Sequence, residues 1–313
     1  MNDLMPGIMR LIAIAPILIS TFFFSKNVCS QDMIGTDTTG KRPMQISPDT
    51  NSAAREGFLS GGEESGLSEE YIEMASDSSW WFRKIDNRAF GVGERLEFSV
   101  KYGKLPAGSA VLEIPAIIEH EGYDCYEIIS IAHSNDVVSV FYRVRDTVKT
   151  VVDVDGVFPR KFWKKLQEGT YKTEKTTVFD QKNHYAITDS DTIPTYTFVQ
   201  DAFSSLYYAR TQNLIPGQDI YIDNHTGKKN FPLKLMVLKR EKVKVPAGEF
   251  KCIVVEPVMR AEGIFKAKGR IRVWLTDDRY KIPVLMKTEV FFLGSISAQL
   301  KSFTPGRIEG EIE

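Results

Sequence analysis

Hydrophobic and polar residues alternate along most of the chain from residue 94 onward. Leu96, Phe98 and Val100 lie in phase, and polar residues stand between them. A period of two is typical of strands that bury one face. Turn sequences such as Asp155-Gly156 separate successive runs, which favours an antiparallel sandwich or barrel over alternating strands and helices. The predicted strands are 94–102, 109–114, 123–132, 146–153, 160–166, 170–179, 184–188, 219–224, 233–245, 250–257, 263–275, 284–292 and 296–303.

The first hairpin turn is predicted over residues 104–108. Pro106 stands at the second turn position and Gly108 at the fourth. This arrangement suits a type I turn followed by a left-handed glycine.

Two helices interrupt the predicted strands. Asp201 is a good N-cap for a helix over 202–211, because its carboxylate accepts a backbone N–H that has no partner inside the helix. One face of that helix carries Phe203, Leu206, Tyr207 and Arg210. A second helix is predicted over 136–144, where apolar residues recur at helical spacing, although its β-branched residues weaken helix formation.

The N-terminus has the pattern of a secretory signal peptide. Arg10 precedes an apolar run over 11–24, and Val28 and Ser30 fit the −3 and −1 positions of a cleavage site. The run is shorter than the roughly 20 residues that span a bilayer. We therefore expect cleavage after Ser30, no transmembrane span in the mature form, and a periplasmic or cell-envelope location. Cys29 leaves a lipoprotein as an alternative, although a lipobox favours a smaller residue than Val28 before the cysteine.

Composition divides the rest of the chain into two parts. Of its 313 residues, 42% are hydrophobic and 26% are charged, with a net charge of −1, so global basicity does not point to nucleic acid. Residues 31–79 carry a net charge of −7 and few apolar side chains, which predicts a disordered acidic linker. Residues 80–303 form the predicted β domain, and 304–313 form a C-terminal tail.

Several stretches together resemble the bacterial family known as domain of unknown function 3108. They are 201–210, 245–250, and 274–278 followed by Pro283-Val284, and Gly294, Ala298 and Leu300 match the closing strand. The resemblance covers roughly residues 90–303. It implies an exported, all-β protein with an open or half-closed antiparallel barrel or sandwich and one or two short helices. It implies no established activity.

Catalytic patterns are scarce in this sequence. It has no G-x-S-x-G nucleophile elbow, H-E-x-x-H or P-loop, and its four histidines are scattered. We predict no catalytic residues, no metal ligands and no cofactor. Cys125 and Cys252 lie in apolar strands, where buried thiols are the default. An exported location leaves a disulfide between them as an alternative.

Arg210 is the most specific candidate for a polar site. It shares a helix face with Tyr207, and a guanidinium drawn into the core must be paired. Asp277 and Asp278 are the carboxylates predicted to pair with it, and Trp274 is close to them in sequence. We therefore predict a ligand site of Arg210, Tyr207, Trp274, Asp277 and Asp278. Two alternatives remain: Arg210 can reach solvent at the end of its helix, and the two aspartates can be turn residues.

Three functions fit these observations. The first is a non-catalytic binding or carrier module for a lipid, glycolipid or envelope polysaccharide, because a β-barrel can hold an apolar ligand. Two basic stretches, 160–175 and 228–244, add an anionic envelope ligand as a candidate partner, although solvated outer faces also have this composition. The second is an assembly protein that binds other envelope proteins. The third is an envelope hydrolase that uses Asp278 or a metal.

Overall fold

The computed structural model describes residues 83–227, 229–259, 270–290 and 294–308. The predicted signal peptide 1–30, with Cys29, lies outside these residues. So do the predicted linker 31–79 and residues 309–313 of the predicted tail.

One antiparallel sheet of fourteen strands makes up most of the described chain. The strands are β1 (Arg95–Tyr102), β2 (Leu105–His120), β3 (Tyr123–Ser134), β4 (Arg145–Asp153), β5 (Pro159–Glu168), β6 (Tyr171–Asp180), β7 (Tyr185–Thr188), β8 (Asp191–Pro194), β9 (Ile220–Thr226), β10 (Lys229–Val245), β11 (Gly248–Met259), β12 (Arg270–Thr276), β13 (Pro283–Val290) and β14 (Gly294–Thr304). From β8 the sheet runs through consecutive strands to β1, then from β14 through consecutive strands to β9. Two meanders, β1–β8 and β9–β14, thus join where β1 pairs with β14.

The predicted alternation is confirmed on β1, where Leu96 and Phe98 are buried and Glu97 is partly exposed. The position of the first turn was predicted wrongly. The chain reverses at Gly103, whose φ of +56° is in the left-handed region, and Leu105 already pairs with Tyr102. Gly108 instead lies within β2, where a Cβ would be 2.1 Å from the carbonyl oxygen of His133. This glycine therefore permits the close approach of β3 and forms no turn.

Both predicted helices are present. Helix α6 (Ala202–Thr211) is capped by Asp201, whose side chain accepts from the backbone N–H groups of Phe203 and Ser204. Helix α5 (Asp136–Phe141) is shorter than predicted, because Tyr142 is extended and Val144 forms a β-bridge with Glu168. Neither described helix has the length and apolar character needed to cross a bilayer.

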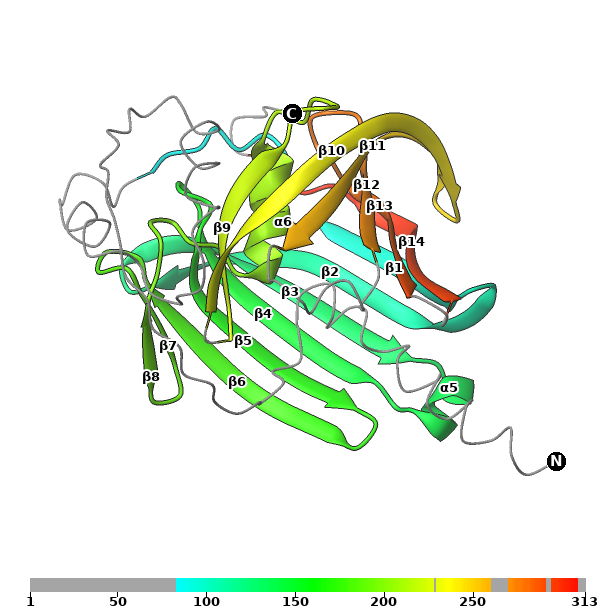
Figure 1. Cartoon of the computed structure of the whole chain (residues 1–313), viewed down its shortest axis with the longest axis horizontal. Coiled ribbons are helices and arrows are strands. Elements are labelled where there is room, and N and C mark those ends of the chain that lie inside the picture. The colour runs from blue at the N-terminus through cyan, green and yellow to red at the C-terminus, as the bar shows by residue number, and fades with distance from the viewer. Residues whose placement is uncertain (1–82, 228, 260–269, 291–293, 309–313) are drawn as a thin grey trace, which may run out of the picture.

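The sheet curls around α6, as Figure 1 shows. The hydroxyl group of Thr150, on β4, donates to Asp201 at the start of this helix, and Asn224, on β9, donates to the Asp201 carbonyl oxygen. The edge strands β8 and β9 do not pair with each other. Side-chain contacts draw the two ends of the sheet together, including a hydrogen bond from Asn230 to the Pro194 carbonyl oxygen. The predicted half-closed barrel is confirmed.

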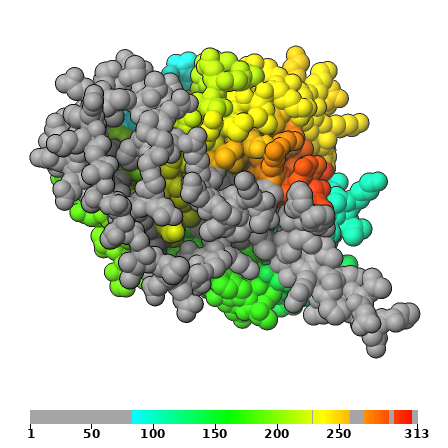
Figure 2. Space-filling model, in the orientation of Figure 1, coloured from blue at the N-terminus to red at the C-terminus, as the bar shows by residue number. Residues whose placement is uncertain are grey.

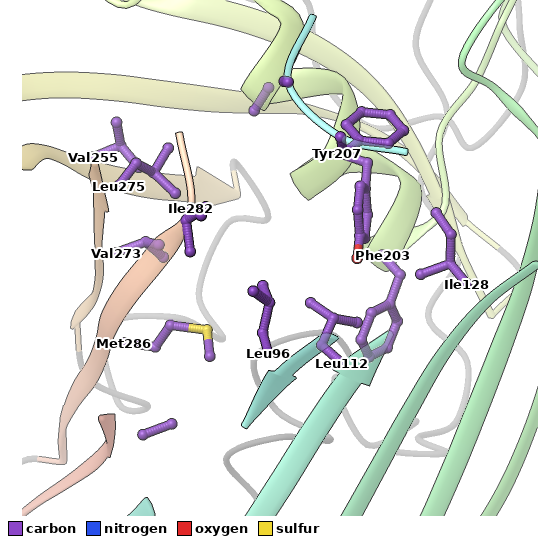
Figure 3. Close-up of a cluster of buried hydrophobic side chains, with 14 of the residues drawn as sticks. Leu96, Leu112, Ile128, Phe203, Tyr207, Val255, Val273, Leu275, Ile282 and Met286 are labelled. Carbon is purple, nitrogen blue, oxygen red and sulfur yellow. The ribbon is translucent and has the colours of Figure 1, made fainter. Parts of the chain in front are cut away.

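The core lies on the concave face of this curl (Figure 3). Leu96 and Leu112 contribute from β1 and β2, and Phe203 and Tyr207 contribute from α6. Residues from the second meander, including Val273, Leu275 and Met286, belong to the same buried cluster. Helix α6 is therefore surrounded by both halves of the sheet.

Candidate functional site

Arg210 is fully buried and paired, but with a different carboxylate from those predicted. Its two terminal nitrogens donate to the two carboxylate oxygens of Glu94, at 2.7 and 2.5 Å. Glu94 precedes β1, so this ion pair connects the last turn of α6 to the centre of the sheet. The prediction of a buried, bidentate guanidinium is confirmed, and its assignment to Asp277 or Asp278 was wrong.

The remaining polar contacts around this pair are also within the protein. Nε of Arg210 donates to the carbonyl oxygen of Tyr280 at 3.1 Å, and a terminal nitrogen donates to that of Ala89 at 3.1 Å. The hydroxyl group of Tyr207 donates to Glu94 at 3.2 Å. Burial opposes the charge of Arg210, but the adjacent Glu94 carboxylate outweighs it, and the pKa is raised. Arg210 and Tyr207 lie together, as predicted, and their hydrogen bonds to Glu94 hold α6 against the start of β1.

The other three predicted site residues bond to groups other than the Arg210 guanidinium and the Glu94 carboxylate, although Asp278 and Arg210 both bond the backbone of Tyr280. Asp277 accepts a hydrogen bond from Nε of Arg240 at 2.9 Å. Asp278 accepts from the backbone N–H groups of Tyr280 and Lys281, which is the turn geometry kept as an alternative. Nε1 of Trp274 donates to Glu241 at 2.6 Å. Within the described part of the chain, none of these three side chains forms a hydrogen bond with Arg210 or Glu94.

Cys125 and Cys252 are both buried and free. They lie on β3 and β11, in different halves of the sheet, and each thiol contacts a carbonyl oxygen of its own strand. Burial raises the pKa of each thiol to about 12, which keeps it neutral and unreactive at physiological pH. The structure therefore contains the thiols and not the alternative disulfide. Across the described residues, no three His, Cys, Asp or Glu side chains gather in a way that could hold a metal ion.

The basic stretch 228–244 forms much of β10, whose surface is yellow in Figure 2. Three of its exposed cations have acidic partners: Lys239 pairs with Glu241, Arg240 with Asp277, and Lys242 with Glu249. These contacts favour a solvated outer face over a site for an anionic ligand.

A cluster that we did not predict lies on the concave face of β4 and β5. Asp146, Lys164 and Glu168 are in phase there with buried apolar neighbours. Asp146 is 3% exposed, and its Oδ1 accepts from the backbone N–H of Gln167 at 3.0 Å. Its other carboxyl oxygen, Oδ2, is buried and has no hydrogen-bond partner in the structure. The sequence carries a signal for two of these residues, because Asp146 and Lys164 fall at apolar-phase positions of the predicted strands 146–153 and 160–166. Glu168 lies beyond the predicted end of that strand, and the observed β5 extends to include it.

The environment shifts the titration of this cluster. Burial, followed by the adjacent Glu168 carboxylate, raises the pKa of Asp146 to about 7. Burial and the nearby Lys175 lower the pKa of Lys164 to about 8, although Glu168 partly offsets them. Near neutral pH the Asp146 carboxyl can therefore hold a proton and act as a hydrogen-bond donor.

Small side chains continue the same row of the sheet beside Asp146. Ala132 pairs with Asp146 across β3 and β4, and Ala110 pairs with Ala132 across β2 and β3. Phe98 follows on β1. The row therefore places the buried Asp146 carboxyl group beside apolar side chains of the core cluster.

A family model described as "Protein of unknown function (DUF3108)" matches residues 97–301. No curated protein is similar enough to the chain to count as a match. A solved β-barrel-like protein of domain of unknown function DUF1849 from Brucella abortus shares 10% identity and a TM-score of 0.47, over 70% of this chain and 100% of that one. A Bacteroides fragilis protein described as exported, with a YmcC-like fold, shares 13% identity and a TM-score of 0.28, over 71% and 100%.

Proposed function

The chain belongs to the DUF3108 family of proteins of unknown function, and we propose that it is an exported cell-envelope protein that binds an amphipathic lipid without catalysing a reaction. The export part of the proposal is supported by the sequence pattern over residues 1–30. The mature chain then begins at Gln31 and works outside the cytoplasm.

The observation that carries the binding proposal is the polar cluster within the concave face. Asp146 offers a carboxyl oxygen that no protein group satisfies, beside the small side chains of Ala132 and Ala110. A buried polar group without a partner is costly, and a ligand oxygen that accepts its proton would remove that cost. The hydrocarbon part of the same ligand would lie along the apolar row. A fatty acid or another lipid with an oxygen-rich head group has this chemistry.

One observation argues against the use of Asp278 by the hydrolase that the sequence left open. The Asp278 carboxylate accepts hydrogen bonds from the backbone of its own turn. Arg210 is already bonded to Glu94 and two carbonyl oxygens. These groups support the fold, which leaves the concave polar cluster as the candidate for binding.

Displacement of a fluorescent fatty-acid probe tests this proposal. The wild-type chain should bind the probe, and Ala132→Leu should weaken binding about tenfold or more, because the larger side chain fills the row beside Asp146. Ile131→Leu, one residue away on the opposite face of β3, is the matched control and should bind like the wild type. Circular dichroism checks that both variants fold. Equal binding by the wild type and a folded Ala132→Leu would contradict the proposed location, and no binding by the wild type would contradict the lipid.

A further inference from the structure

Helix α5 presents its apolar side chains to solvent. Val137, Val140 and Phe141 are 73%, 78% and 64% exposed, and no residue of this helix is buried. Leu105, at the start of β2, is 68% exposed. Single exposed apolar residues are ordinary, but a group of large ones at one place usually marks an interaction site.

These four residues lie at the same end of the sheet, and we call them the apolar tip. The helix fills the connection between β3 and β4, and Leu105 follows the turn between β1 and β2. Two hydrogen bonds hold the segments together: the backbone N–H of Asn135 donates to the carbonyl oxygen of Ala107 at 2.9 Å, and its side chain donates to that of Pro106 at 2.8 Å. Figure 1 shows α5 at the outer end of β3 and β4.

Exposed cations surround the apolar tip. Lys104 precedes Leu105, and Arg143 and Arg145 follow the helix. The turn between β5 and β6 adjoins them through a hydrogen bond from Gly169 to the Arg143 carbonyl oxygen, 2.8 Å long, and it brings Lys172 to the same end. Among the described residues, these four cations form no salt bridge with a carboxylate, unlike those on β10. The one acid of the helix is Asp136.

This combination matches the surface of a membrane. Apolar side chains that enter the acyl boundary and cations that contact anionic headgroups are the two contributions that hold proteins at a bilayer interface. A second copy of the chain is a poorer partner, because its tip would bring the same cations together. We propose that the apolar tip docks this protein on a lipid surface that contains anionic headgroups. This docking surface is separate from the concave cluster and does not depend on it.

Co-sedimentation with vesicles tests the docking surface. The experiment uses the protein purified from its own host. Vesicles of phosphatidylcholine mixed with phosphatidylglycerol should sediment the wild type, and vesicles of phosphatidylcholine alone should sediment much less. The double variant Val140→Asp, Phe141→Asp should lose binding by about tenfold or more, because two charges would enter the interface. Raising the salt concentration should weaken wild-type binding, because salt screens the cations.

Phe303→Asp is the matched control. Phe303 is 39% exposed and pairs with Leu96, at the other end of β1 from the apolar tip. Thermal unfolding establishes that both variants are folded, and the control should then bind like the wild type. Equal sedimentation of the wild type and the tip variant would overturn the proposal. A wild type that binds neither kind of vesicle would also overturn it. Self-association that the tip variant abolishes, without vesicle binding, would reassign the tip to a protein partner.

Discussion

Asp146 shows how the position of one side chain within a strand determines its chemistry. On β4 it is in phase with Val148 and Val152, so the alternation that buries these valines also buries the carboxyl group. Burial and the neighbouring Glu168 raise its pKa to about 7. The protonated form then predominates in the folded chain at pH values where an exposed aspartate is ionised.

Asp146 should make the stability of the domain depend on pH. Between about pH 4 and 7 the unfolded chain has released this proton and the folded chain retains it, so stability falls as pH rises through that window. Asp146→Asn removes the titration. The variant should gain about 2–4 kcal/mol over the wild type between pH 4 and pH 8. Urea unfolding at the two pH values measures this difference.

Thr147→Ala is the control for this prediction, because Thr147 faces away from the cluster and has no group that titrates in this range. It should leave the pH profile of the wild type unchanged. An Asp146→Asn variant with the same pH profile as the wild type would show that Asp146 is not the titrating group.

The sequence indicated that Arg210 could be buried in an ion pair, but it did not identify Glu94 as the partner. Helical spacing places Arg210 on the face of Phe203 and Tyr207, which favours burial and pairing but left a solvent-exposed guanidinium as an alternative. Glu94 lies 116 residues away, and no local pattern distinguishes it from the other acids of the chain. The pairing of β1 with β14 brings the first strand to the middle of the sheet, and only that topology makes Glu94 available.

At the scale of elements, α6 is fixed to the sheet at both ends. Asp201 caps its start and accepts a hydrogen bond from Thr150 on β4. Arg210, in its last turn, forms the buried ion pair with Glu94 before β1. The helix therefore links two parts of the first meander, and Asn224 links it to β9.

Breaking the ion pair should destabilise the domain strongly. Glu94→Gln or Arg210→Met leaves one buried charge without its partner, which should cost about 3–5 kcal/mol. The double variant Glu94→Gln, Arg210→Met should cost less than the two single changes together, because no uncompensated charge remains. Urea unfolding measures the three variants.

Arg240→Ala is the matched control for the buried pair. It removes the pair with Asp277 on the outer face, in which Arg240 is 52% exposed, and it should cost less than about 1 kcal/mol. Equal costs for Arg210→Met and Arg240→Ala would show that burial adds nothing to the Arg210 interaction.

Element types were easier to predict than element ends. Alternation identified every described strand except β8, whose four residues were predicted to lie outside the strands, and the Asp201 cap identified the start of α6. The first turn was misplaced because a Pro-Ala-Gly sequence suits a turn, whereas the positive φ of Gly103 reverses the chain earlier. Helix α5 ends early because Val144 joins the sheet beside Glu168, a tertiary contact that outweighs local periodicity.

At the scale of the whole molecule, two meanders form one sheet that curls around a single helix. Regular short strands predicted an antiparallel sandwich or barrel, and the family resemblance implied its open or half-closed form. The full order of the strands was not predictable from the sequence. Most pairings join strands that are neighbours in sequence, but the β1–β14 pairing joins the first and last strands of the domain, and no local pattern indicates it. The resulting curled sheet has a concave face that carries the polar cluster, and the apolar tip lies at one end of this sheet.

Native mass spectrometry of the chain purified from its own host tests the central claim most directly. The account predicts a polypeptide that begins at Gln31 and carries one amphipathic lipid, released when the complex is activated. The same measurement on Ala132→Leu should show the processed chain with little or no lipid. A wild-type chain that still begins at Met1, or one that is recovered as bare polypeptide under the gentlest conditions, would contradict an exported lipid-binding protein.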